Sequence, residues 1–173
     1  MMTSYLRTPA FKLGRKGFVG DWVTILVFLF LAGVTFVFMA YLLTTTNTAL
    51  QADDSIAQEG KDILAQGEGS YPGMMDAFLS VFFFGLPIVT AALAWFLATD
   101  NPFLWLFFAA TFVFVLIAAA LANSWHYITD VAILQDTVSR FPMTDFVLNN
   151  FAMYALLVGA MIAFGLYMRT KSQ

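Results

Sequence analysis

Two side chains with the right types and spacing for chemistry are His126 and Asp130. They lie four residues apart, so a helix would place both on one face. An imidazole beside a carboxylate can act as a proton-sensitive pair or as half of a metal site. The chain has one histidine and no cysteine, which falls short of the usual ligand set for structural zinc. We therefore interpret the pair as an interfacial histidine with a helical neighbour. We predict no catalytic, cofactor-binding or metal-binding residue.

Acidic side chains could also hold a cation, and they gather in two polar stretches. Their spacing does not match an EF-hand loop. We interpret them as a solvated acidic surface that faces partner proteins. Its predicted members are Asp53, Asp54, Glu59, Asp62, Asp130 and Asp136.

Composition places most of the chain in lipid. Of its 173 residues, 61% are hydrophobic and 11% are charged, with a mean hydropathy of +0.80. Soluble domains are about half apolar and about a quarter charged. No ionisable residue lies well inside the apolar runs, whereas ion paths and proton relays normally need one. We therefore predict an integral membrane protein that is neither an enzyme nor a pump.

Four apolar runs, at 22–43, 77–98, 103–122 and 146–168, are long enough to cross a hydrocarbon core of about 30 Å. A basic arm at 1–20 precedes them. The acidic segment 44–76 joins the first pair and is predicted to hold a short amphipathic helix at 49–65. An amphipathic, acidic segment at 123–145 joins the second pair, and its helix could continue to about Ser139. A basic tail follows the last run.

Several residues are predicted to shape these helices. Small residues every fourth position let another backbone approach, and aromatic residues suit the headgroup level. Asp76 is predicted to cap the second apolar helix, and Pro87 to kink it. The predicted packing face is Ala155, Gly159 and Ala163; the interface belt is Trp22, Trp125, His126 and Tyr127; the helix breaks and caps are Pro72, Asp76, Pro87, Pro102, Pro142 and Asp145.

An internal repeat suggests how the helices are organised. Tyr71-Pro72 with Asp76 matches Phe141-Pro142 with Asp145, each before an apolar run. We predict an all-α polytopic protein of four transmembrane helices, built as two tandem helical-hairpin repeats, 1–98 and 99–173. Parallel copies imply a pseudo-two-fold axis along the membrane normal. Six of the eight Lys and Arg residues flank the first and last apolar runs, so both termini should face the cytoplasm or its equivalent.

The tail Phe141-Pro142-Met143-Thr144-Asp145-Phe146-Val147-Leu148-Asn149-Asn150-Phe151, entering a terminal helix, resembles small multi-pass proteins in the internal membrane of tailless icosahedral viruses and phages. The resemblance covers about the last quarter of the chain. It implies many copies per virion and contact with capsid proteins.

We therefore predict a structural membrane protein that packs in the bilayer. Two other classes remain open: a holin-like pore-forming protein, and an accessory subunit of a larger membrane complex. The expected partners are a lipid bilayer of a virion or a prokaryotic cell, and other membrane or capsid proteins. Self-association is left open. The basic residues of the N-terminal arm are spread out with little aromatic interleaving, so no nucleic acid is expected.

Overall fold

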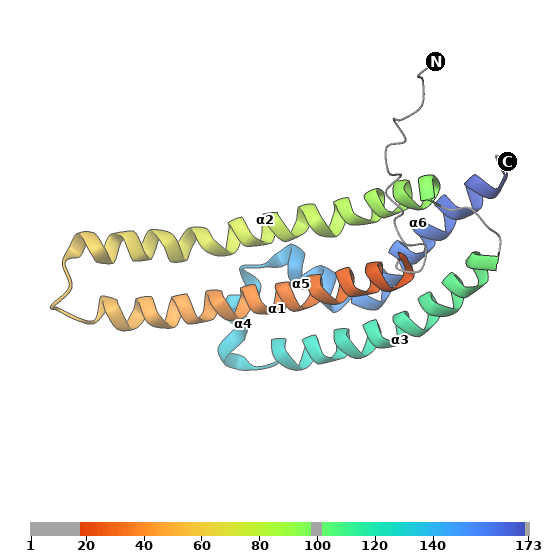
Figure 1. Cartoon of the computed structure of the whole chain (residues 1–173). Helices are drawn as coiled ribbons and strands as arrows, with labels where there is room; N and C mark the ends of the chain where they lie inside the picture. Colours follow the sequence, from red (N-terminus) through yellow and green to blue (C-terminus); the bar gives the residue numbers. More distant parts are fainter. Residues whose placement is uncertain (1–17, 98–101, 172–173) are drawn as a thin grey trace, which may run out of the picture.

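Six helices make up the described part of the chain, which in this computed structural model covers residues 18–97 and 102–171. They are α1 (Phe18–Gln51), α2 (Gln58–Leu97), α3 (Pro102–Thr129), α4 (Ala132–Ser139), α5 (Pro142–Asn149) and α6 (Phe151–Lys171). Figure 1 shows α1, α2, α3 and α6 as a bundle, with α4 and α5 packed at one end. The predicted basic arm falls mostly outside the described residues, and residues 98–101 also lie outside them.

Four of these helices, α1, α2, α3 and α6, are long and apolar enough to cross a membrane. Within residues 18–97 and 102–171, this confirms the prediction of an all-helical fold with four such segments. The two connections differ in form, because α1 and α2 are joined by the turn 52–57 and α3 and α6 by two short helices. The tandem-repeat symmetry stays a prediction.

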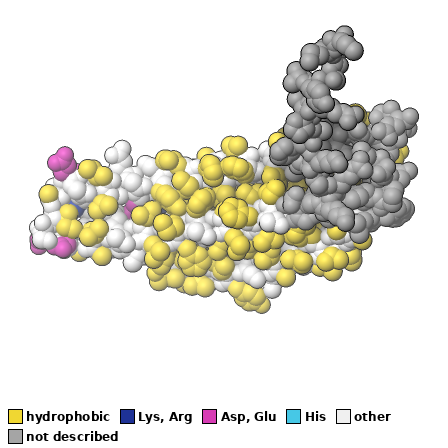
Figure 2. Space-filling model, viewed as in Figure 1, with side chains coloured by type: hydrophobic (Ala, Val, Ile, Leu, Met, Phe, Trp, Pro, Cys, Tyr) yellow, Lys and Arg dark blue, Asp and Glu magenta, His cyan; other side chains and the backbone are white. Residues whose placement is uncertain are grey.

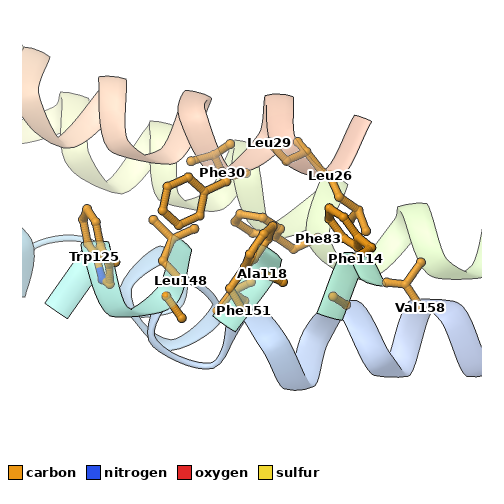
Figure 3. Close-up of a cluster of buried hydrophobic side chains, with 14 of the residues drawn as sticks. Leu26, Leu29, Phe30, Phe83, Phe114, Ala118, Trp125, Leu148, Phe151 and Val158 are labelled. Atoms are coloured by element: carbon orange, nitrogen blue, oxygen red, sulfur yellow. The ribbon is translucent and has the colours of Figure 1, made fainter. Parts of the chain in front are cut away.

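The core lies where α6 packs between α2 and α3 while α1 covers α2. Its largest side chains are aromatic: Trp22 makes an edge contact with Phe114, and Phe30 contacts Phe151, each at a centroid distance of 5.1 Å. Figure 3 shows buried side chains from all four long helices meeting in this cluster. Lipid is as apolar as these side chains, so the hydrophobic effect does not drive the helices together. Close packing of the rings must therefore favour this arrangement of the helices.

The hairpin of α1 and α2 is longer than predicted. α1 continues to Gln51 instead of ending at Leu43, and the predicted helix at 49–65 is wrong because the chain turns there at 52–57. Pro72 does not break α2, which runs without interruption from Gln58 to Leu97. Packing against α1 and α5 explains this difference. The single backbone hydrogen bond that proline removes costs less than the contacts along the helix supply.

Pro87 also lies inside α2 without ending it. Because proline has no N–H, the carbonyl of Phe83 four residues earlier has no helical donor. The Tyr154 hydroxyl of α6 donates to this oxygen at 2.7 Å. The hydrogen bond that proline removes from α2 is thus replaced by one between α2 and α6.

Replacing Tyr154 with phenylalanine should therefore lower stability by about 1–3 kcal/mol, the cost of leaving a buried carbonyl unpaired. The measurement is the mole fraction of SDS at which the purified protein unfolds in mixed micelles. Tyr127→Phe is the matched control, because this hydroxyl lies on an exposed side chain. Equal midpoints for the two variants would contradict the assignment.

Three glycines in the first half of α2, Gly67, Gly69 and Gly73, have open space where a Cβ would lie. Glycine in a helix interior is less favourable than alanine by about 0.5–1 kcal/mol. We expect Gly69→Ala to slow amide hydrogen exchange in this half of α2. Gly33→Ala is the contrasting control, since its Cβ would lie 3.1 Å from side-chain atoms of Thr144 and Leu148. Unchanged or faster exchange in Gly69→Ala would show that this stretch is not a regular helix.

The second half of the chain departs from the predicted bounds in two places. α3 ends at Thr129 and does not continue to Ser139; Asp130 and Val131 separate it from α4. The last apolar run is divided, so Asp145 lies inside α5 and does not cap the terminal helix, which begins at Phe151. Pro102 and Pro142 do stand at the first positions of α3 and α5. Proline suits that position because its missing N–H needs no partner there.

Candidate functional site

The most distinctive surface is the polar arm, defined here as residues 44–51 of α1, the turn 52–57 and residues 58–75 of α2. Figure 1 shows this end of the α1–α2 hairpin extending past the other helices. α2 has 40 residues, which span about 60 Å, twice the hydrocarbon core of a bilayer. Only its apolar part can lie in lipid, so the polar arm projects beyond it.

Near its tip the arm is closed by a reciprocal pair of hydrogen bonds. The Lys61 ammonium donates to the carbonyl of Gln51 at 2.9 Å, and the Gln51 amide donates to the carbonyl of Lys61 at 2.8 Å. Gln51 ends α1, where backbone carbonyls lack helical partners and a cation is favourable. Lys61 is buried, so its charge stabilises the hairpin and is not displayed at the surface.

Farther down the arm, the Glu68 carboxylate joins three elements. It accepts hydrogen bonds from Thr44 at 2.9 Å and from Asn47, both on α1. Arg140, which follows α4, donates to it at 3.2 Å and to Asp136 at 3.0 Å. The pKa of Glu68 is lowered, first by the Asn47 hydrogen bond and then by those from Thr44 and Arg140, against the opposing effect of burial. Glu68 thus ties the arm to the α4–α5 region.

This lowered pKa makes the stability of the arm depend on pH. A carboxylate with a depressed folded pKa contributes stability that is complete above its unfolded pKa and is lost as pH falls through the folded value. We expect arm amides, corrected for intrinsic rates, to exchange faster at acidic pH than at neutral pH. The difference should shrink in Glu68→Gln and persist in Glu59→Gln, whose side chain is exposed. An equal pH response in both variants would contradict the role of Glu68.

The tip of the arm carries the predicted partner-facing acids Asp53, Asp54, Glu59 and Asp62, all exposed. Figure 2 shows acidic side chains at this end, away from the hydrophobic part of the bundle. Ser55 donates its hydroxyl and its N–H to one oxygen of Asp53, which lowers the pKa of that carboxyl. Asp62 accepts from Gln58 at 2.9 Å. The tip is therefore a negative, solvated surface.

The other two predicted acids lie nearer the bundle. Asp130 is exposed in the turn between α3 and α4, and Asp136 is an exposed member of the Arg140 ion pair. Neither stands at the tip. The structure therefore separates the six predicted acids into a group of four at the tip and two beside α4.

Asp76 has a different role from the one predicted. It lies in the middle of α2 and caps another helix: its two carboxylate oxygens accept the N–H groups of Thr144 at 2.7 Å and of Met143 at 3.2 Å. These N–H groups belong to the first turn of α5, which begins at Pro142 and has no capping side chain of its own. The two proline junctions, at 71–76 and 141–145, therefore meet, and the acid of the first caps the helix that begins at the second.

A partly buried hydrogen bond joins α3 to α5. The indole of Trp125 donates to Asp145 at 2.9 Å, and Asn149 donates to the same oxygen. Trp125 is fully buried, and so is Trp22, which packs against Phe107 and Phe114. The bundle therefore supplies partners for the rings of both tryptophans, and the interface belt stays a prediction. His126 and Tyr127 are exposed.

The His126–Asp130 pair forms one backbone hydrogen bond, from the Asp130 N–H to the His126 carbonyl at 3.0 Å. Across the described ranges, no group of three or more His, Asp and Glu side chains is placed to hold a metal ion. The pair therefore stands at a helix end, where the hydroxyl of Thr129 also donates to the His126 carbonyl.

The predicted packing residues Ala155, Gly159 and Ala163 are buried in α6. A Cβ on Gly159 would lie 2.5 Å from a methyl carbon of Thr111, which shows a close approach of α6 to α3. Gly165, which the sequence pattern did not single out, faces the Ala91 carbonyl of α2. A single glycine therefore allows the close approach of α6 to α2.

Glu68, Lys61 and Arg140 were missed as functional candidates. Their local sequence carries no motif, since Glu68 and Arg140 are 72 positions apart. One usable signal was that Lys61 and Arg140 are the only cations between the terminal basic segments. Comparison of the chain with protein-family models, with curated protein sequences and with solved structures found no match.

Proposed function

We propose that this chain is a structural integral membrane protein that holds its polar arm outside the bilayer for a partner protein to bind. The observation that carries the proposal is the Glu68 network, which joins the two helices of the arm to each other and to the segment after α4. A surface held in place before binding loses less conformational freedom on binding. The role is therefore scaffolding, without a catalytic step.

The chemistry of the tip indicates the kind of partner. Four exposed acids lie there, and the neighbouring Lys61 is buried. A basic protein surface complements this charge, which raises association rates and selects against acidic partners. We propose a capsid protein above a virion internal membrane as this partner, with both termini of the chain on the opposite side of the membrane.

The interior of the bundle supports a structural role over conduction through one chain. Trp22, Phe83, Phe114 and Phe151 fill it from four helices. Induced expression followed by a membrane-potential dye tests this directly. Depolarisation at moderate expression would favour the pore class over the scaffold.

The partner is tested by mass spectrometry of native particles or membranes that contain the chain. Capsid proteins recovered in a fixed ratio with many copies of the chain would support the virion setting. Recovery with respiratory, transport or secretion subunits would overturn it in favour of an accessory subunit.

A variant with Asp53, Asp54, Glu59 and Asp62 changed to their amides should lose the partner while remaining in the membrane. Gln66→Ala is the matched control, because Gln66 is exposed on the arm below the tip. Retention of the partner by the neutralised variant would contradict docking at the tip.

A further inference from the structure

The apolar surface of the bundle is taller than the hydrocarbon core of a bilayer. The hydrogen bond from Thr44 to Glu68 sets the end of the apolar run of α1 level with Glu68. The 28 residues from Glu68 to Trp95 span about 40 Å along α2; over the first eight of them, which form the base of the polar arm, the apolar surface is that of α1. Leu42 at one end and Trp95 at the other are both exposed, whereas the core is about 30 Å thick.

Tilting alone does not remove this mismatch. Bringing about 40 Å of apolar surface into about 30 Å requires a tilt of roughly 40°, the limit of the range for transmembrane helices. The bilayer with its headgroup regions is about 40–45 Å thick. Part of the apolar surface therefore lies at the headgroup level.

The arm side of the bundle carries such a surface, which we name the collar. Its members are exposed apolar or aromatic side chains on the end of α3, on α4 with the residue before it, and on α5: Tyr127, Val131, Ile133, Met143 and Phe146. Ile133 is 63% exposed and Phe146 is 62% exposed, while Leu134 and Val138 of α4 point into the core. Gln135 and Asp136 on α4 are exposed polar side chains. Side chains of both kinds on the outside of one short helix suit a membrane interface.

We propose that the collar inserts into the boundary between headgroups and acyl chains of the arm-side leaflet, and that it makes the protein wider in that leaflet. The collar continues the apolar surface of the spanning helices, so the molecules that cover it are lipids of the same bilayer. Figure 2 shows that hydrophobic side chains cover the bundle and become fewer along the arm. The Arg140–Glu68 bond holds the junction of α4 and α5 at the base of the arm.

The width follows from the arrangement of the helices. Among the described residues, the arm side holds both α4 and α5 beside α1, α2 and α3, whereas the opposite side holds α6 in their place (Figure 1). A body that is wider in one leaflet favours membrane that is convex on that side, and shallow apolar insertion is sensitive to curvature. The chain therefore prefers membrane curved away from the end of the bundle opposite the arm, as on the outside of a small vesicle. This inference goes beyond the proposed docking role and holds whether or not the arm has a partner.

Depth of insertion tests the first part. The chain has no cysteine, so single cysteines can carry an environment-sensitive fluorophore in vesicles of phosphatidylcholine and phosphatidylglycerol. We expect the label at Ile133→Cys to be quenched by lipids with a spin label near the headgroup. A label at Val113→Cys, exposed in the middle of α3, should be quenched by a deep spin label, and one at Ala57→Cys near the arm tip by neither. An Ile133 label that behaves like the Ala57 label would overturn the insertion.

Curvature preference tests the second part. An impermeant dye on Ala57→Cys labels only molecules whose arm faces the outside of a giant vesicle. We expect these molecules to be severalfold denser on a membrane tube pulled from the vesicle than on the vesicle itself. Ile133→Gln combined with Phe146→Gln should abolish the enrichment, whereas Ile63→Gln, an exposed site on the arm, should keep it. Equal density of the labelled parent protein on tube and vesicle would overturn the preference, and so would enrichment that survives in the double variant.

Discussion

Replacing Asp76 with asparagine should destabilise the protein by about 2–4 kcal/mol, because it leaves one of two N–H groups in the first turn of α5 without an acceptor and takes the charge from the other hydrogen bond. That turn lies 67 residues farther along the chain. An amide has one acceptor oxygen, so the N–H of either Met143 or Thr144 must face the amide donor group. Thr144 is fully buried, so water cannot easily reach its N–H group to replace the lost acceptor. The mole fraction of SDS at unfolding, followed by tryptophan fluorescence, measures the loss.

Asp54→Asn is the matched control, because it makes the same chemical change at an exposed site on the arm. Hydrogen exchange should show where the Asp76 variant loosens: amides in α5 should exchange faster, while those of α6 should change less. A variant that unfolds at the same SDS fraction as the control would show that Asp76 does not hold α5 in place.

Replacing Gly165 with alanine should cost about 1–3 kcal/mol, because the added methyl group overpacks the contact between α6 and α2. Its Cβ would lie 2.6 Å from the Ala91 carbonyl oxygen and 3.4 Å from the Cβ of Ala94. The oxygen belongs to the backbone of α2, so relief requires the two helices to move apart. The same SDS titration measures the effect.

Gly85→Ala provides the matched control, since this glycine of α2 has nothing within 4 Å of the added Cβ. It should be neutral or stabilising by up to about 1 kcal/mol. Gly159→Ala offers a second comparison, because its Cβ would meet the methyl group of Thr111, and Thr111→Ser should restore the lost stability. Equal effects at Gly165 and Gly85 would indicate that α2 and α6 are farther apart than the structure shows.

The four apolar helices and the acidic tip were predictable because they depend on composition and local length. A run of about 20 apolar residues must find lipid or a core wherever it lies in the chain. Pro102 and Pro142 at helix starts were equally predictable, since the steric rule for proline involves only its neighbours.

The bounds of the arm were not predictable from local rules. Pro72 is a predicted helix break, and Gly67 and Gly69 just before it also disfavour a helix, yet α2 continues through all three. Glycine weakens a helix by about 1 kcal/mol and proline by about 3 kcal/mol. Contacts with α1 and α5 along α2 exceed those costs, and they come from residues that no local window contains.

The sequence by itself determined that this protein is helical, that most of it belongs in lipid, and that its acids gather in its two polar connections. Only the tertiary structure decided what the polar groups do. Asp76 caps α5, Glu68 binds Arg140, and Trp125 is buried against Asp145. The physical reason is that a buried donor or acceptor takes whichever partner the packing brings near, and here packing brings partners from positions 20 to 72 residues away.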